Sequence, residues 1–362
     1  MTVEEVNNIP FFFIVGRGRS GTTLLQNVLD ANDSVLLPLE SFLIISLKNK
    51  FFNTKKWTEK KIDAFIAAVY KEPLFVAYWD ISRESLRNYL QSLPKKELTF
   101  SLLCKEVYLQ FPSVFPKKSI KIIGDKNPPY SLFMEELITV FPEAKFIHLL
   151  RDYRNQIVSA RKHFTLQNVA LLAYKWEIHN RAIDKQKQKN PSAFYTLKYE
   201  DFTADPEKYT REMCSFLGIS YQAEMLQFHK KTTTYFETEK FGFDVIHPHL
   251  LEPIANKNTS AWQKEFTEKE KETIDYIAGD YAAKYGYPKT HPKKNIRLFC
   301  TLLYCQCQHQ IDIRVTKMYY KLPFFIRDFF HLSSKKMYEW FGYINYYSKQ
   351  IDKMKKAQKN KF

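Results

Sequence analysis

The chain has 362 residues, of which 45% are hydrophobic, and its formal net charge is +16 at pH 7. This length and composition allow a large buried core, but no apolar run reaches the 18 or more residues that a membrane-spanning helix requires. The first residues, 1–5, lack the basic segment of a signal peptide, and five cysteines are too few and uneven for a disulfide framework. We therefore expect a cytoplasmic protein.

Strands and helices alternate along the first 290 residues. Four short apolar runs have the composition of buried parallel strands: Phe11–Val15, Ile120–Gly124, Lys145–Leu150 and Ala193–Lys198. Helical segments follow them: Thr22–Asp30, Tyr130–Val140, Asn155–Phe164, Val169–Lys189 and Pro206–Leu217. This alternation predicts an α/β fold with a doubly wound parallel sheet.

Residues 40–111 read as a helical insertion in the first crossover, with helices over Lys60–Tyr70 and Arg83–Leu93. Ligands bind at the carboxyl ends of the strands in such a sheet, and we expect the insertion to lie above those ends. Its aromatic residues would line an apolar pocket, although aromatic residues at helical spacing also commonly form core. They are Phe51, Phe52, Phe65, Tyr70, Phe75, Tyr78 and Trp79.

The first predicted strand runs directly into the segment Gly-Arg-Gly-Arg-Ser-Gly-Thr-Thr at residues 16–23. Glycines let backbone N–H groups turn onto an anion, and the following helix adds the partial positive charge of its N-terminus. The spacing fits the phosphate loop of nucleotide-binding proteins, except that Thr22 stands where that loop has a lysine. Because the lysine contacts the β- and γ-phosphates of a nucleoside triphosphate, its absence disfavours an ATPase or a kinase.

Arg19-Ser20-Gly21-Thr22-Thr23 resembles the 5′-phosphosulfate loop of the sulfotransferases that use 3′-phosphoadenosine 5′-phosphosulfate (PAPS). A second block supports the resemblance, because Arg151 follows a predicted strand and Ser159 comes eight residues later, as in the family's 3′-phosphate signature. A guanidinium clamps a phosphate, and a serine two helical turns further on lies on the same face. The resemblance covers roughly residues 11 to 287. It implies in-line sulfuryl transfer from PAPS to an acceptor hydroxyl, without a metal.

The same resemblance suggests two catalytic residues. Lys126 matches the family lysine that steadies the leaving group at the bridging oxygen. In the cytosolic small-molecule enzymes the catalytic histidine stands two positions later, where this chain has Pro128. Glu40 occupies a place similar to that of the glutamate base in the tyrosylprotein and heparan branches, and its apolar neighbours would desolvate it. His163 is the weaker candidate for the base.

Two further nucleotide contacts are implied. Tyr199 matches the family tyrosine that contacts the adenine, and Lys257 would supply a last contact to the 3′-phosphate, although the Arg-Lys-Gly triplet of the cytosolic enzymes is absent. Structural alternatives stay open for three residues. Lys126 could be a surface lysine in a turn, Glu40 a helix-start carboxylate, and Tyr199 a core tyrosine.

A turn-rich linker at residues 286–292 separates a domain of residues 1–290 from a helical extension of residues 291–362. From Pro292 onward the chain carries fifteen Lys or Arg and four Asp or Glu, a net charge of +11, interleaved with aromatic residues. This composition suits an anionic membrane surface contacted through residues 293–361, while simple packing of a helix on the main domain is the alternative. Nucleic acid is not the expected partner. The cluster of Cys300, Cys305, Cys307 and His309 matches no standard zinc spacing, so we expect no metal.

The sequence thus predicts a PAPS-dependent sulfotransferase that is cytoplasmic or peripheral at the inner membrane surface. We expect a lipophilic alcohol, such as a sterol or lipid, as the acceptor, and a carbohydrate or peptide tyrosine is the alternative. A nucleotide-binding membrane adaptor without catalysis is the rival function, but an adaptor would have no use for Glu40 and Lys126.

Overall fold

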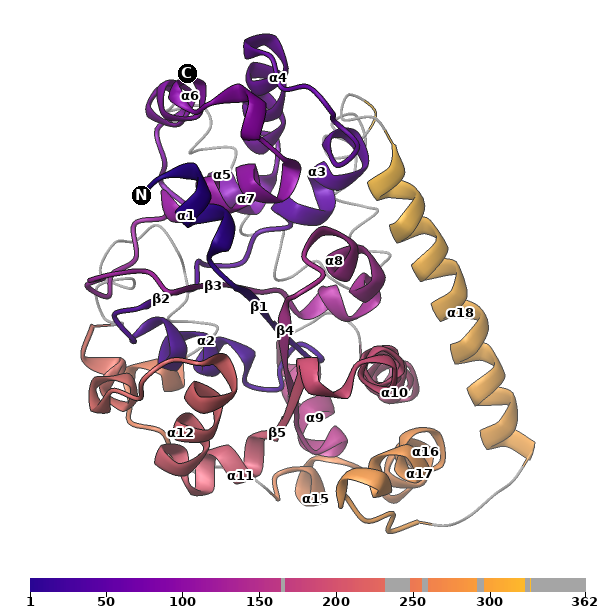
Figure 1. Cartoon of the computed structure of the whole chain (residues 1–362). Coiled ribbons are helices and arrows are strands. Elements are labelled where there is room, and N and C mark those ends of the chain that lie inside the picture. Colours follow the sequence, from indigo (N-terminus) through magenta and orange to yellow (C-terminus); the bar gives the residue numbers. More distant parts are fainter. Residues whose placement is uncertain (164–166, 232–247, 256–259, 292–295, 323–325, 327–362) are drawn as a thin grey trace.

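A five-stranded parallel sheet forms the centre of the protein (Figure 1), in a computed structural model that describes residues 1–163, 167–231, 248–255, 260–291, 296–322 and 326. The strand order is β2-β3-β1-β4-β5, so the chain winds outward in both directions from β1, as predicted. The strands are β1 (Phe11–Val15), β2 (Val35–Leu36), β3 (Ile122–Lys126), β4 (Lys145–Leu150) and β5 (Phe194–Lys198). The two-residue β2 was not predicted, and β3 starts and ends two residues later than expected, which places Lys126 in the strand itself.

Both faces of the sheet are buried. Successive side chains of β1 point to opposite faces, and all of them are buried. Phe11, Phe13 and Val15 belong to one hydrophobic core, whereas Phe12 and Ile14 belong to the other. Complete burial of such a side chain contributes about 1.5–3 kcal/mol. The continuous apolar sequence of β1 is therefore what a strand covered on both faces requires.

Helices cover the two faces (Figure 1). The core that contains Phe12 is closed by α2 (Thr22–Asp30), α11 (Tyr199–Ala204) and α12 (Pro206–Leu217). The core that contains Phe11 includes residues of α1 (Val3–Asn8), α3 (Leu43–Phe51), α7 (Phe100–Leu109) and α8 (Met134–Val140). A third core lies between α9 (Tyr153–His163), α10 (Val169–Lys189), α15 (Trp262–Glu265), α16 (Glu268–Ile274) and α17 (Asp280–Ala282).

The helical insertion consists of α3, α4 (Glu59–Val69), α5 (Pro73–Tyr78), α6 (Arg83–Ser92) and α7. Its aromatic residues form core rather than the expected pocket. Phe51 and Phe65 are fully buried and meet edge to face at 5.3 Å, and Trp57 stacks on Phe51 at 6.0 Å. In addition, α7 packs against α1, which precedes β1. The insertion therefore also extends to the amino end of the sheet, beyond the position above the carboxyl ends that we expected.

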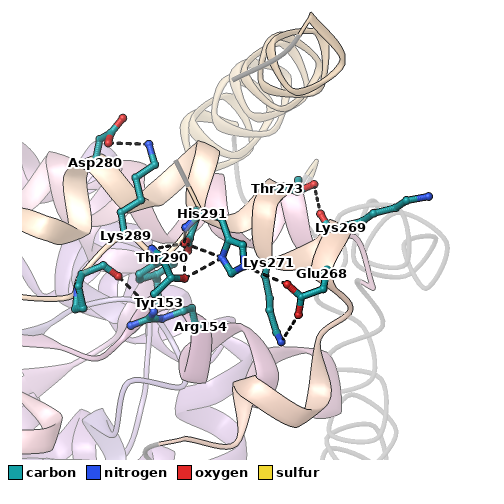
Figure 2. A network of polar contacts seen from close by, with 12 residues as sticks. Tyr153, Arg154, Glu268, Lys269, Lys271, Thr273, Asp280, Lys289, Thr290 and His291 are labelled. Carbon is teal, nitrogen blue, oxygen red and sulfur yellow. Dashed lines mark hydrogen bonds and ion pairs between the residues drawn. The ribbon is translucent and has the colours of Figure 1, made fainter. Parts of the chain in front are cut away.

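Asp275 fixes residues 290 and 291, which precede helix α18 (Ile296–Lys321), to the main domain. Its partners Tyr153, Thr290 and His291 are labelled in Figure 2. Asp275 accepts hydrogen bonds from the hydroxyl of Tyr153 and from the backbone N–H groups of Thr290 and His291. Burial alone would raise the pKa of Asp275, but these hydrogen bonds outweigh it and hold that pKa below its usual value. The imidazole of His291 also lies 3.2 Å from a carboxylate oxygen of Glu268.

The long helix α18 (Ile296–Lys321) lies along the outside of the molecule against α10 and α3 (Figure 1). Its Asp312 pairs with Lys175 of α10 at 3.0 Å, and its Tyr320 stacks on Phe42 at 5.4 Å. The predicted helical extension thus packs on the main domain at least as far as Tyr320. Cys305 and His309 face inward, whereas the two other cysteines of α18 are exposed. Within the described ranges, no helix is long and apolar enough to cross a membrane.

Candidate active site

Each of the five strands leads into a residue that the sequence marked as functional. Because parallel strands end at one edge of the sheet, these residues meet there although they are far apart in the sequence. The phosphate loop follows β1, Glu40 follows β2, Lys126 ends β3, Arg151 and Ser159 follow β4, and Tyr199 follows β5. Lys257 lies outside the described residues.

The glycines of the loop are needed for close contact. Gly16 and Gly21 have φ values of 153° and 97°. An added Cβ would lie 2.4 Å from the carbonyl oxygen of Leu149 at Gly16, and 2.5 Å from the ring of Tyr199 at Gly21. The loop can therefore approach the ends of β4 and β5 only with glycine at these positions.

Arg19 holds the loop in an unusual conformation. Its φ of 72° lies in the left-handed region, which costs a non-glycine residue about 1–3 kcal/mol. Two contacts stabilise it: Nη1 of Arg151 donates to the carbonyl oxygen of Arg19 at 3.1 Å, and Nε of Arg19 donates to Oγ of Ser159 at 3.3 Å. Strain of this kind is concentrated at functional sites. Here the two contacts that stabilise Arg19 also link the two predicted phosphate signatures.

Arg151 is oriented from several sides. Its guanidinium lies over the ring of Tyr199 at 4.5 Å, and its carbonyl oxygen accepts a hydrogen bond from Trp176. Nε of Arg151 and Oγ of Ser20 are buried and have no hydrogen-bond partner within the described residues. Buried polar groups normally have partners, and both of these suit the oxygens of a phosphate or sulfate.

Lys126 and Glu40 form an ion pair beside the loop. Nζ of Lys126 donates to Oε1 of Glu40 and also to Oγ1 of Thr23 at 3.3 Å. The side chain of Lys126 is 2% exposed and that of Glu40 is 14% exposed. A cation thus lies at the start of α2, while the carboxylate keeps some access to a second reactant.

Four side chains from other parts of the chain hold the segment that carries Glu40, residues 37–42. Gln26 donates to the carbonyl oxygen of Pro38 at 2.6 Å, and Trp79 donates to that of Leu39 at 2.8 Å. Asn127 and Tyr130 both donate to the carbonyl oxygen of Ser41, at 2.9 and 3.1 Å. A base positioned in this way loses little conformational freedom when it reacts.

Two buried carboxyl groups support the same region, and neither was anticipated. Glu72 caps α5 and accepts hydrogen bonds from Phe42 N–H and the Ser41 hydroxyl, yet burial raises its pKa to about 7. Asp125 precedes Lys126 and accepts a hydrogen bond from Tyr108 at 2.6 Å, and burial raises its pKa to about 7 as well. Only the Glu-Pro pair at residues 72–73, a helix-start signal, could have pointed to Glu72.

Three further residues near the loop were not predicted to be functional. Arg17 belongs to the loop itself and is 5% exposed. Gln156 of α9 donates to the carbonyl oxygen of Gly18 at 2.5 Å and thereby ties the loop to α9. His179 of α10 lies 2.6 Å from Oγ of Ser131. His163 is the last residue of α9, and its side chain is outside the described part of the chain.

Comparison with known proteins decides the family. A family model described as "Sulfotransferase family" matches residues 10–223, which is more than half of the chain and includes the loop, Glu40, Lys126, Arg151 and Ser159. The chain belongs to the sulfotransferase family. The prediction of a sulfotransferase is thus confirmed, and the adaptor without catalysis is not supported.

Individual relatives of this sulfotransferase are distant. Omega-hydroxy-beta-dihydromenaquinone-9 sulfotransferase Stf3 of Mycobacterium bovis is 23% identical over 332 residues, which cover 80% of this chain and 78% of Stf3. A putative protein-tyrosine sulfotransferase of Caenorhabditis briggsae is 21% identical over 300 residues, which cover 79% of this chain and 92% of the relative. Among solved structures, the sulfotransferase domain from the curacin biosynthetic pathway has a TM-score of 0.50 at 19% identity. That match covers 75% of this chain and 97% of the domain, and it supports the fold alone.

Proposed function

We propose that this sulfotransferase transfers the sulfuryl group of PAPS to the hydroxyl of a lipophilic alcohol, such as a sterol or lipid. The observation that carries the proposal is the convergence of the five strand ends, which places the Lys126–Glu40 pair beside a phosphate loop. The Ser20 hydroxyl and Arg151 Nε, which have no hydrogen-bond partner among the described residues, fit the anionic ends of such a donor.

The residues divide into a binding group and a reacting group. Residues 19–23 would hold the 5′-phosphosulfate, Arg151 and Ser159 the 3′-phosphate, and Tyr199 the adenine. Lys257, beyond the described ranges, would add a contact to the 3′-phosphate. No group of three or more potential metal-binding side chains occurs in the described part of the chain. The proposed chemistry requires no metal ion.

In the reacting group, Glu40 accepts the proton of the acceptor hydroxyl while the oxygen of that hydroxyl forms a bond to sulfur. The bond between sulfur and the bridging phosphate oxygen breaks, and the products are a sulfate ester and adenosine 3′,5′-bisphosphate (PAP). Lys126 stabilises the negative charge that develops on the leaving oxygen. Before the reaction, the contact with Lys126 holds the Glu40 side chain beside the phosphate loop.

The outward face of α18 supports a lipid environment. Its large hydrophobic side chains, each at least 43% exposed, are Ile296, Phe299, Leu303, Tyr304, Ile311 and Met318. Arg297, Arg314, Lys317 and Lys321 are exposed on the same helix, whose one acidic residue, Asp312, pairs with Lys175. A helix that combines apolar and basic side chains in this way suits the surface of an anionic membrane.

We therefore include docking of α18 on an anionic membrane surface in the proposal. The mycobacterial relative is named for a menaquinone derivative, which agrees with a lipophilic acceptor, whereas other relatives are named for protein tyrosine. The cytoplasmic location and the division at residue 290 stay predictions.

Two measurements test this function. Melting temperatures should rise with PAP and much less with ATP, and stabilisation by ATP alone would refute the choice of donor. Transfer of radiolabelled sulfate from PAPS should then be compared on sterols, lipid alcohols, oligosaccharides and tyrosine peptides. We expect labelled sterols or lipids, and exclusive labelling of sugars or peptides would overturn the acceptor class while leaving the sulfotransferase intact.

A further inference from the structure

A buried basic cluster lies between the phosphate loop and the helices α10 and α18. Arg17 comes from the loop, Lys175 and His179 lie one turn apart on α10, and His309 comes from α18. The guanidinium of Arg17 is close enough to both histidines to lower their pKa values. Their residue exposures are 5%, 4%, 1% and 2%, respectively. Four basic side chains from three separate elements are thus gathered out of contact with bulk water.

Side chains of α10 and α18 form two contacts in this cluster. Lys175 of α10 pairs with Asp312 of α18 at 3.0 Å, and one turn further along, the ring centroids of His179 and His309 are 6.3 Å apart. Nδ1 of His179 contacts Ser131, which belongs to the turn of residues 128–132 directly beyond Lys126. The cluster therefore contacts the turn that follows Lys126.

Within the described residues, the cluster carries more positive charge than its neighbours balance. Asp312 compensates Lys175, but no carboxylate of the described chain pairs with Arg17, and Nε of Arg17 has no hydrogen-bond partner there. Both ring nitrogens of His309 also lack a partner among these residues. Burial of an unbalanced cation and of unsatisfied donors is unfavourable, so a ligand that supplies negative charge would stabilise this arrangement.

The imidazoles are suited to hydrogen bonding rather than to ion pairing in the unliganded protein. Burial and the Arg17 guanidinium hold the pKa of His179 well below its usual value, and burial and Lys175 lower the pKa of His309 to about 4. Neutral imidazoles each keep one N–H donor. An oxyanion bound between them would raise both pKa values again.

We propose that Arg17, His179 and His309 form an oxyanion subsite for an anionic group that the acceptor carries near the hydroxyl to be sulfated. This inference rests on the proposed function, and it narrows the acceptor to a lipophilic alcohol with a phosphate or carboxylate. The guanidinium supplies the balancing charge, and the two imidazoles supply directed N–H groups. An uncharged alcohol would leave Arg17 unbalanced.

The first test compares ω-hydroxyalkyl phosphates with alkanols of the same chain length as acceptors in PAPS transfer. In the wild-type protein we expect kcat/KM to be about tenfold or more higher for a phosphate of suitable length, since hydrogen bonds between charged groups contribute at least this factor. Arg17→Gln and His309→Gln should each reduce that ratio toward one. Arg211→Gln, at an exposed arginine of α12, is the control and should keep the ratio.

A second measurement needs no turnover. The PAP-saturated protein should bind dodecyl phosphate more tightly than dodecanol in calorimetry, and Arg17→Gln and His309→Gln variants with wild-type melting temperatures should lose the difference. Equal binding of the two probes by the wild-type protein would overturn the subsite. If the difference is present but no PAPS transfer occurs on any acceptor, the proposed function fails while the oxyanion subsite stands.

The donor's own sulfuryl group is the other source of an oxyanion near Arg17. If Arg17 held that group, Arg17→Gln would weaken PAPS binding far more than PAP binding, and the preference for phosphate acceptors would persist. That result would assign Arg17 to the donor and overturn the proposal. Equal effects on PAPS and PAP together with loss of the acceptor preference would support it.

Discussion

Glu40 and Lys126 form an ion pair at the ends of two adjacent strands, although 86 residues separate them in the sequence. Lys126 is almost completely buried and also reaches Thr23 in the phosphate loop. Removal of either partner therefore leaves a charge without compensation in a poorly solvated place. Substitutions here will affect stability as well as turnover.

Glu40→Gln should lower kcat by about 10²–10⁴-fold, which is the usual contribution of a general base. The amide keeps the shape of the side chain but cannot accept the proton, so PAP affinity should change little and the acidic limb of the pH–rate profile should disappear. Glu207→Gln, which breaks an exposed ion pair with Arg211, is the control. Near-normal turnover in Glu40→Gln, with loss of activity in His163→Ala, would give the role to the histidine.

Lys126→Met should also lower kcat, but through loss of charge stabilisation at the leaving oxygen. Each single variant, Glu40→Gln or Lys126→Met, should lower the free energy of unfolding, by up to about 3 kcal/mol for a pair that is largely buried. The double variant should lose less than the two single losses together, because no unpaired charge remains. Urea denaturation of the four proteins measures this coupling, and strict additivity would show that the pair does not interact in solution.

Arg151→Lys should weaken PAP binding by about tenfold or more, since lysine keeps the charge but loses the fork that grips a phosphate. Adenosine 5′-phosphate lacks the 3′-phosphate, so its affinity should change much less. Ser159→Ala should show the same selectivity with a smaller effect. Calorimetry with both nucleotides measures the difference. Equal losses would mean that Arg151 acts through its contact with the backbone of Arg19 instead.

The parts of the site that the sequence predicted are those that follow directly from a strand. The loop after Val15 and Arg151 after Leu150 are each local signals, and a parallel sheet brings them together without further information. Lys126 could be placed in the same way even though its strand was predicted two residues too early. Glu40 was identified from the resemblance, because the two-residue strand that positions it is too short to recognise.

The remaining parts depend on contacts between distant segments. Phe51 and Phe65 have the spacing of either a pocket or a core, and only the packing of the insertion shows that they form core. Arg17, His179 and His309 meet because α18 docks across α10, and nothing in the local sequence of α18 indicates that contact. The supporting role of Glu72 likewise depends on the path of residues 37–42.

Glu72→Gln should make folding stability less dependent on pH. The pKa of Glu72 is raised to about 7 in the folded protein, above its ordinary value of 4.5. Between these values the folded state binds more protons than the unfolded state, so stability should fall as the pH rises from about 4.5 to 7 and then level off. Asp125, with its pKa also raised to about 7, should contribute in the same direction.

Urea denaturation at several pH values from 4.5 to 8 measures this slope. Glu72→Gln should reduce it, and the exposed Glu84→Gln on α6 should not. Because Glu72 also contacts Ser41 and Phe42 beside the proposed base, Glu72→Ala should additionally lower kcat. An unchanged slope in Glu72→Gln would show that this carboxyl is ionised in the folded protein throughout the range.

Substitutions on the outer face of α18 should weaken binding to anionic vesicles without affecting nucleotide binding. Truncation before α18 is a poor test, because Asp312 and Tyr320 pack on the main domain and His309 is buried against it. Arg314→Gln with Lys317→Gln removes two exposed charges, each contributing about 1 kcal/mol near an anionic surface, and salt should reduce their effect. Phe299→Ser with Leu303→Ser should weaken the salt-resistant part instead.

Vesicle sedimentation with phosphatidylserine-containing and purely zwitterionic lipid separates these two contributions. The charge variant should lower binding to the anionic vesicles by roughly an order of magnitude or more, while the apolar variant should lower binding to both. Gln306→Ser with Gln310→Ser, two exposed uncharged positions on the same helix, is the control and should bind like the wild-type protein. If every variant kept wild-type vesicle binding and PAP affinity, the exposed face of α18 would have no role at the membrane, and the support that it gives to a lipid acceptor would be lost.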